Sequence, residues 1–142
     1  MRRLEFPIKS FLKESLEWED RIKKLKEEQE ALLGLPSVDN STGIRSSEPS
    51  NMTASIALRR LKIQSEIEEI LLDKEMLRYA IKQLSEDERE ILNGFFYPKK
   101  PKGLFVWEYG RKHGLGKNLV YEEKDRVLEK MRVCIEEEYY ED

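Results

Sequence analysis

The chain has 142 residues, enough for one ordinary domain or for a small domain that carries a helical arm. Charged residues make up 39% of it, and strict alternation of polar and apolar positions is missing, which excludes large β-sheets. No apolar run approaches the roughly 18 residues that a membrane helix needs, and the N-terminus lacks the apolar core of a signal peptide. Cys134 is the single cysteine, so we expect a cytoplasmic, all-α protein without an intrachain disulfide.

The net charge of −3 at pH 7 argues against a nucleic-acid-binding protein, but the charges are unevenly distributed. Between Tyr97 and Val133 the sequence holds ten basic and five acidic residues, a local charge of +5. Acidic clusters lie on both sides of this segment, at Glu86–Glu90 and at Glu136–Asp142. The last third of the chain is therefore the part whose charge suits a polyanion such as DNA.

Helical periodicity predicts a first long helix that begins at Pro7 and ends at Gly34. Proline is tolerated in a first helical turn, and glycine is typical of a helix end. Steps of three and four positions predict one apolar seam along this helix, formed by Ile8, Phe11, Ser15, Trp18, Ile22, Leu25, Gln29 and Leu32. Residues 34–52 are rich in Ser, Pro, Gly and Asn, and we predict a flexible linker there.

A second long helix is predicted from about Thr53 to Leu84. Its seam is mostly isoleucine and leucine, interrupted by Arg60 and Lys74. A seam of about 29 residues is some 43 Å long at ~1.5 Å per residue, which is longer than a small globular domain can bury. The seam therefore needs another helix to pack against. Two pairings remain open: an antiparallel hairpin with the first helix of the same chain, or a homodimer through the N-terminal helices. A DNA-binding role would favour the homodimer, because two docking units about 34 Å apart match one turn of the duplex.

The remaining residues predict three shorter helices. A capping box, Ser85–Glu88, begins the first of them, and residues 97–103 form a loop rich in lysine and proline. A short helix spans residues 104–113, a turn occupies residues 114–116, and a last helix runs from 117 to about 139. Helical spacing predicts a buried stripe on this last helix, formed by Val120, Val127, Leu128, Met131 and Ile135. We expect two parts, a helical arm at residues 1–84 and a second domain at residues 85–142.

The short helix, the turn and the last helix meet the requirements of a helix-turn-helix. Gly110 is small enough for a close approach of the two helices, and Gly114 tolerates a left-handed backbone at the turn. Leu115 follows as an apolar plug, and Val120 is the apolar anchor five residues later. This spacing indicates a unit that docks on double-stranded DNA.

The same segment resembles region 4 of bacterial sigma factors. The resemblance covers about 45 residues, from Leu84–Leu92 through Val106–Gly110 to Gly114-Leu115. Its continuation Val120–Leu128 is similar to phage transcriptional regulators of the ArpU and RinA type. The resemblance implies an N-terminal helical part, a sigma-like helix-turn-helix, control of late genes of a phage or prophage, and RNA polymerase as a second partner.

If the last helix enters the major groove, the residues at its start reach the base edges, and basic residues before it bind phosphates. We expect Lys117, Asn118, Tyr121 and Glu122 at base edges. We expect phosphate contacts from Lys99, Lys100, Lys102, Arg111 and Lys112. The carboxylates Glu122, Glu123 and Asp125 depart from a usual recognition helix, because they repel phosphates and accept only from cytosine amino groups.

The alternatives do not involve catalysis. One histidine and one cysteine provide neither a usual zinc ligand set nor a nucleophilic dyad, so we expect no enzyme activity, no cofactor and no metal. A glycine-containing turn between amphipathic helices also occurs in purely structural hairpins. The rival function is a coiled-coil adaptor, or a small phage packaging protein that resembles a terminase small subunit.

Overall fold

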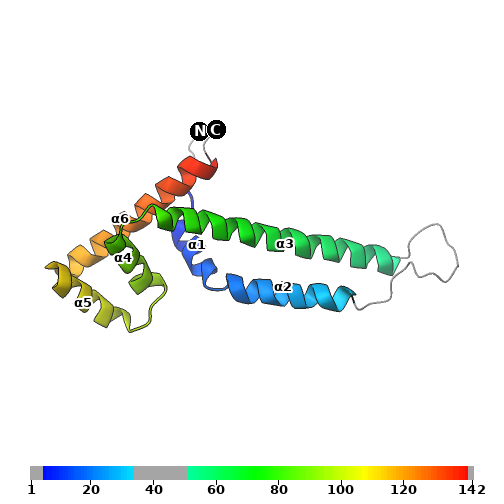
Figure 1. Cartoon of the computed structure of the whole chain (residues 1–142), viewed down its shortest axis with the longest axis horizontal. Coiled ribbons are helices and arrows are strands. Elements are labelled where there is room, and N and C mark those ends of the chain that lie inside the picture. Colours follow the sequence, from blue (N-terminus) through cyan, green and yellow to red (C-terminus); the bar gives the residue numbers. More distant parts are fainter. Residues whose placement is uncertain (1–4, 34–50, 141–142) are drawn as a thin grey trace. The chain divides into compact units, whose positions relative to one another are not determined.

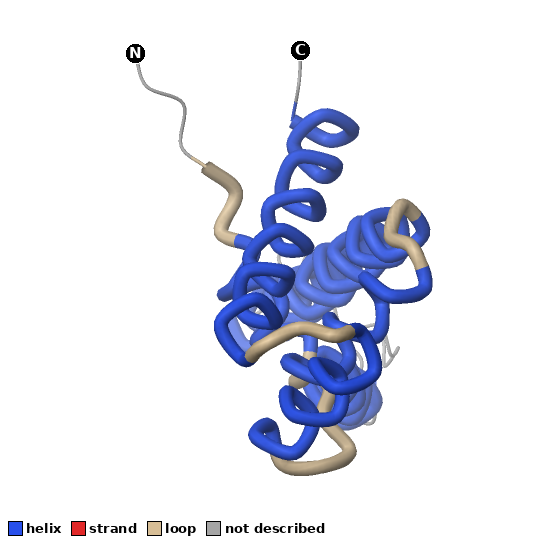
Figure 2. Tube along the Cα trace, turned by 90° about the vertical axis from the view of Figure 1, so that its left-hand side faces the viewer, coloured by secondary structure: helices blue, strands red, loops and turns tan. Residues whose placement is uncertain are grey.

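The computed structural model describes residues 5–33 and 51–140 of the chain (Figure 1). All regular structure in these residues is helical, which confirms the predicted all-α class (Figure 2). The elements are α1 (Ile8–Ser15), α2 (Trp18–Leu33), α3 (Asn51–Lys82), α4 (Glu86–Phe96), α5 (Lys102–His113), α6 (Lys117–Ile135) and the short π-helix η1 (Glu136–Tyr140). None of these helices combines the length and the apolar composition needed to cross a bilayer.

The predicted linker lies outside the described residues, except for its last two positions. Asn51 and Met52 belong to α3, so this helix begins two residues earlier than predicted. The described residues form two compact units, one of residues 5–16 and 74–140, the other of residues 17–33 and 51–73. This division differs from the predicted boundary at residue 84 in two respects. The end of α3, from residue 74, belongs to the C-terminal unit, and so does α1, which packs against α6.

The first predicted helix is interrupted, and this part of the prediction is wrong. Leu16 and Glu17 form a turn between α1 and α2. The Leu16 N–H donates to the carbonyl of Lys13 at 3.3 Å, and the Ser15 hydroxyl donates to the carbonyl of Leu12 at 2.5 Å. A serine that bonds back to the preceding turn competes with the helical hydrogen bonds and bends the helix. The predicted seam is consequently split between the two units.

In the unit of residues 17–73, α2 and α3 pack side by side in opposite directions (Figure 1). Their core is a buried cluster of Leu25, Ile63 and Ile67, against which Leu32 and Ile70 pack. Ion pairs tie the two helices from outside, Arg21 to Glu66 at 2.7 Å and Arg59 to Glu28 at 2.6 Å. The seam of α2 is therefore paired within the chain, which is one of the two arrangements left open by the sequence.

The other unit has its core among α4, α5 and α6, with α1 and the end of α3 contributing. α6 contacts α4, α5 and α1, and it buries one stripe of its surface. The stripe consists of the five residues predicted for it, Val120, Val127, Leu128, Met131 and Ile135. Ile91 and Leu92 of α4 are also buried, and so is Leu12 of α1.

The predicted capping box at the start of α4 is confirmed. The Glu88 N–H donates to the Ser85 hydroxyl at 3.2 Å, and the Ser85 N–H donates to the Glu88 carboxylate at 2.8 Å. The ammonium of Lys130 on α6 reaches the same carboxylate at 2.8 Å. Burial disfavours the charged form of Glu88, but the hydrogen bonds from Lys130 and Ser85 outweigh it and lower the pKa of this carboxyl.

The α2–α3 core should depend strongly on Leu25, which is almost fully buried. Leu25→Ala should reduce the free energy of unfolding of this unit by about 2–5 kcal/mol, because a cavity remains when the side chain is shortened. Urea unfolding followed by circular dichroism measures the effect. Leu33→Ala is the matched control, since Leu33 on the same helix is exposed. Equal losses in the two variants would contradict the assigned core.

Glu88 should make the C-terminal unit sensitive to acid. A carboxyl whose pKa is lowered by folding stabilises the native state above its unfolded pKa, and this contribution is lost as pH falls through the lower folded value. Glu88→Gln should therefore melt at a lower temperature than the wild type near neutral pH, with the difference closing in acid. Glu86→Gln, an exposed neighbour, is the control. A difference that stays constant with pH would exclude this role.

Candidate nucleic-acid interface

The candidate site is built around the sharp turn between α5 and α6. α5 ends at His113, and the residues Gly114, Leu115 and Gly116 connect it to Lys117, the first residue of α6. Gly114 adopts the left-handed conformation, with φ 67° and ψ 33°. This conformation costs an L-residue about 1–2 kcal/mol but is open to glycine. The turn can therefore reverse the chain over three residues without strain.

Gly110 lies where the backbone of α5 meets the turn. Its carbonyl accepts a hydrogen bond from the Leu115 N–H at 2.7 Å, which closes the end of α5. A Cβ atom added to Gly110 would lie 2.5 Å from the Leu115 carbonyl oxygen and 3.5 Å from a methyl group of Val120. Val120 has no exposed surface, and Leu115 is half-buried. Together with Gly114, these three residues fix the direction in which α6 leaves the turn.

Three of the four residues expected at base edges are exposed at the start of α6, and one is not. Lys117, Asn118 and Glu122 are exposed. Tyr121 is half-buried, and its ring packs edge-on against Phe95 of α4 with the centroids 5.3 Å apart. Tyr121 therefore forms part of the contact between α4 and α6, while the other three side chains remain accessible to a ligand.

The five residues expected at phosphates have different surroundings. Lys100 forms an ion pair with Glu108, and Lys112 forms one with Glu90 at 3.2 Å. Lys102 is the first residue of α5 and not part of the loop, and its ammonium lies 5.7 Å from the ring of Phe95. These three cations already have partners within the protein, and Lys102 packs its charge over an aromatic face.

Lys99 and Arg111 complete the expected phosphate set. Lys99 is exposed in the loop, and Arg111 is exposed with its guanidinium 5.2 Å from the ring of Trp107. A hollow between α4 and α5 has Lys99, Lys100 and Lys112 on its rim, but Glu86, Glu90 and Glu108 share it. Arg89 also lines it, so four basic side chains face three acidic ones and the charge in this hollow is nearly balanced. Outside the hollow, Arg111 and Lys117 are exposed basic side chains on the two sides of the turn.

A cluster of titratable side chains joins α4 to the end of α5, and it was not predicted from the sequence. The Nε2 atom of His113 lies 3.9 Å from an oxygen of Asp87 and 4.0 Å from one of Glu90, and it has no hydrogen bond. The imidazole also packs on the ring of Tyr109, with centroids 4.2 Å apart. Burial and the carboxylate of Asp87 raise the pKa of Tyr109 to about 12, which keeps its hydroxyl protonated.

This cluster is the one group within the described ranges whose ligand atoms approach as a metal site requires, all lying within 4.8 Å of one another. We expected no metal, because one histidine and one cysteine do not make up a usual zinc ligand set. Asp87 and Glu90 are also distant from His113 in the chain. Helix packing is what brings them together. Glu90 already binds Lys112, and His113 is held against Tyr109, so both side chains have structural roles at the α4–α5 contact.

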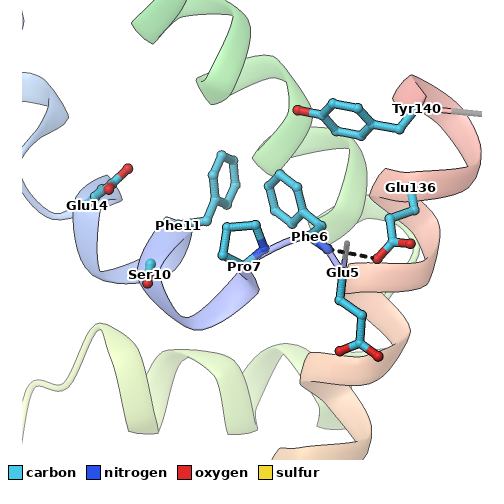
Figure 3. A pocket seen from close by; sticks show the side chains of 8 residues that line it. All are labelled: Glu5, Phe6, Pro7, Ser10, Phe11, Glu14, Glu136 and Tyr140. Carbon is cyan, nitrogen blue, oxygen red and sulfur yellow. Dashed lines mark hydrogen bonds between the residues drawn. The ribbon is translucent and has the colours of Figure 1, made fainter. Parts of the chain in front are cut away.

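A second hollow lies away from the turn, between the N-terminal segment and η1 (Figure 3). The rings of Phe6 and Phe11 meet with centroids 5.0 Å apart, and Tyr140 lies 5.7 Å from Phe6. The Phe6 N–H donates to the Glu136 carboxylate at 3.1 Å. This hollow is lined by aromatic rings and carboxylates, so its charge does not suit a nucleic acid, and no residue predicted to bind DNA lines it.

The tight packing around Gly94, which is comparable to that around Gly110, was also not predicted from the sequence. The ring of Phe105 on α5 lies directly over the Cα atom of Gly94, in the space that any Cβ atom would occupy. Phe105 also meets Phe95 edge-on, with centroids 5.5 Å apart. A helical glycine in an otherwise good helix signals such a contact, but it does not identify the partner.

Gly110→Ala should distort the turn, because its new methyl group would meet a backbone oxygen that cannot move aside cheaply. We expect the free energy of unfolding to fall by about 1–3 kcal/mol, as for other overpacked positions. Chemical unfolding followed by circular dichroism measures this. The matched control is Gly103→Ala in the same helix, where the added atom meets nothing within 4 Å. A loss no larger than that of the control would contradict the close approach.

No family model, curated protein or solved structure matches this chain. The resemblance to sigma region 4 and to the phage regulators therefore depends on the residues quoted for it. What the structure adds is geometry: a left-handed glycine at the turn, a close backbone approach at Gly110, and exposed polar side chains where α6 begins.

Proposed function

We propose that the chain is a non-enzymatic transcriptional regulator that binds double-stranded DNA through α5, the turn and α6, which act as a sigma region 4-like helix-turn-helix. The long helices α2 and α3 form the arm that precedes this domain. The start of α6 enters the major groove, with Lys117 and Asn118 at base edges. The observation that carries the proposal is the contact between Gly110 and Leu115, since it places an exposed helix start next to a tight turn.

The charges at this helix start support the proposal. The first turn of α6 contains no acidic residue, and no side chain caps its N–H groups. Uncapped N–H groups and the helix dipole both favour an anion such as a phosphate. Arg111 on α5 and Lys117 on α6 flank the turn and are exposed, so they supply the phosphate contacts that fix the orientation of the module.

The acidic residues of α6 are divided between two surroundings. Glu123 is bound by Arg126 at 2.6 Å, whereas Glu122 is exposed. An exposed carboxylate at this position accepts from a cytosine amino group, and it penalises other base edges by repulsion. Glu122 therefore favours selective over indiscriminate DNA binding. The resemblance to the ArpU and RinA regulators extends the proposal to late genes of a phage or prophage, with RNA polymerase as a second partner.

Lys117 and Asn118 should carry the sequence preference. The preferred site is first selected from a pool of random-sequence duplexes. Lys117→Ala/Asn118→Ala should then bind that site at least about tenfold more weakly in a gel shift, and discriminate it less from other duplexes, because a base contact contributes about 1–3 kcal/mol. Lys23→Ala/Lys24→Ala on α2 is the control for lost positive charge. Unchanged binding in the first variant would remove these residues from the interface.

The salt dependence of DNA binding distinguishes the proposed regulator from the alternative, a coiled-coil adaptor or packaging protein. Cations that bind phosphates release counterions, so affinity should fall steeply with salt concentration, and Arg111→Ala should lower that slope by about one. A chain that selects no duplex at low salt would refute DNA binding. That result would favour the coiled-coil adaptor or packaging protein, which uses its helices to assemble other proteins.

A further inference from the structure

Helix α3 carries apolar side chains on two opposite faces, and only one of them is covered. Ile63 and Ile67 lie in the buried cluster against α2. Leu58, Leu61 and Leu72 remain 59%, 67% and 51% exposed. Leu72 follows Ile63 by nine residues, which places it on the opposite side of the helix at about 100° per residue.

The exposed leucines follow the spacing of a second seam. Steps of four and three residues connect Ala54, Leu58, Leu61, Ser65, Glu68 and Leu72. We call the surface of Leu58, Leu61 and Leu72 the leucine face. All three belong to the unit of residues 17–73, in which α2 lies on the other side of α3. A row of large apolar side chains of this kind marks an interaction surface when it stays uncovered.

We propose that the leucine face binds the same face of a second copy of this chain, with the two α3 helices antiparallel. The inference goes beyond the proposed function and does not depend on DNA binding. It also differs from the homodimer expected from the sequence, because that dimer was to use the seam which α2 covers within the chain.

The charges around the leucine face decide the orientation. Arg60 and Lys62 are exposed in the first half of this segment, and Glu68 and Glu69 are exposed in the second half. Parallel helices would place like charges side by side, whereas antiparallel helices place each basic half beside an acidic half. The nearby charges Arg59 and Glu66 are already bound by α2, so they do not disturb this pattern.

A second copy fits the surface because two complementary pairs are arranged symmetrically about Ser65, while the third leucine, Leu61, has Glu69 as its counterpart. Leu58 and Leu72 are each seven residues from Ser65, and Lys62 and Glu68 are each three residues from it. A two-fold axis at Ser65 therefore sets Leu58 of one copy against Leu72 of the other, and Lys62 against Glu68. Self-complementarity is what a two-fold interface requires, and an unrelated partner would not require it.

The oligomeric state of the full chain tests the interface. Light scattering coupled to gel filtration should give twice the chain mass for the wild type. Leu58→Gln/Leu61→Gln/Leu72→Gln should raise the dissociation constant at least about 100-fold, since three apolar side chains lose their partners. Circular dichroism should show unchanged helix content, because these side chains are exposed and glutamine is a good helix former. Leu33→Gln on α2 is the matched control and should remain dimeric.

Cysteine cross-linking in a Cys134→Ser background tests the orientation. Under mild oxidation, Ser65→Cys should cross-link to itself. Leu58→Cys and Leu72→Cys should cross-link when mixed but not when each is oxidised alone. Lys62→Glu should weaken the dimer, and Glu68→Lys/Glu69→Lys added to it should restore it.

Three results would overturn the proposal. One is a wild-type chain that stays monomeric at the highest concentration at which it remains in solution. Another is a dimer that survives the triple leucine variant with its dissociation constant unchanged. The third is efficient cross-linking of Leu58→Cys to itself, which indicates parallel helices. None of these results depends on DNA, so failure of the dimer and failure of the proposed function can be told apart.

Discussion

The close approach of two backbone segments at Gly110 is the constraint on which the C-terminal unit depends. The Leu115 carbonyl occupies space that any other residue at position 110 would need, and Val120 closes the contact from α6. The turn can hold this geometry because Gly114 accepts a left-handed backbone. Gly110 acts through its lack of a side chain and Gly114 through its left-handed backbone, and together they determine where the start of α6 lies. The accessibility of Lys117 and Asn118 follows from that position.

Only part of the positive charge between Tyr97 and Val133 is available to a ligand. Within the described residues, Lys100, Lys112 and Lys130 are engaged by Glu108, Glu90 and Glu88. Surface pairs of this kind contribute only about 0–1 kcal/mol, so a phosphate can replace the carboxylate at little cost. The acidic α4 therefore acts as an internal counter-charge. It reconciles a net charge of −3 with a local excess of basic residues, and it would make the proposed DNA binding selective and sensitive to salt.

Local patterns predicted the parts of the fold that depend on local physics. The capping box at Ser85, the turn at Gly114 and the buried stripe of α6 follow from neighbouring residues, and they lie where the sequence placed them. The break after Ser15 was missed because a single hydroxyl, bonded to the preceding turn and 2.6 Å from the hydroxyl of Tyr97, outweighs a regular seam. The contacts of His113 with Asp87 and of Tyr121 with Phe95 were missed because they depend on how whole helices pack.

In helix α3, the periodicity of the sequence identifies an apolar seam but not the surface against which that seam packs. The isoleucine seam was evident in the sequence, but the same helix carries leucines half a turn away, and a search for one amphipathic face overlooks a second. Once α2 covers the isoleucines, the leucines are what remains for association between chains. A homodimer built on them leaves the intrachain hairpin intact, so a hairpin and a dimer can coexist, although this dimer does not use the seam that the sequence indicated. Each chain would then bring one helix-turn-helix to the pair, and the second contact with DNA would benefit from the high effective concentration that the first creates.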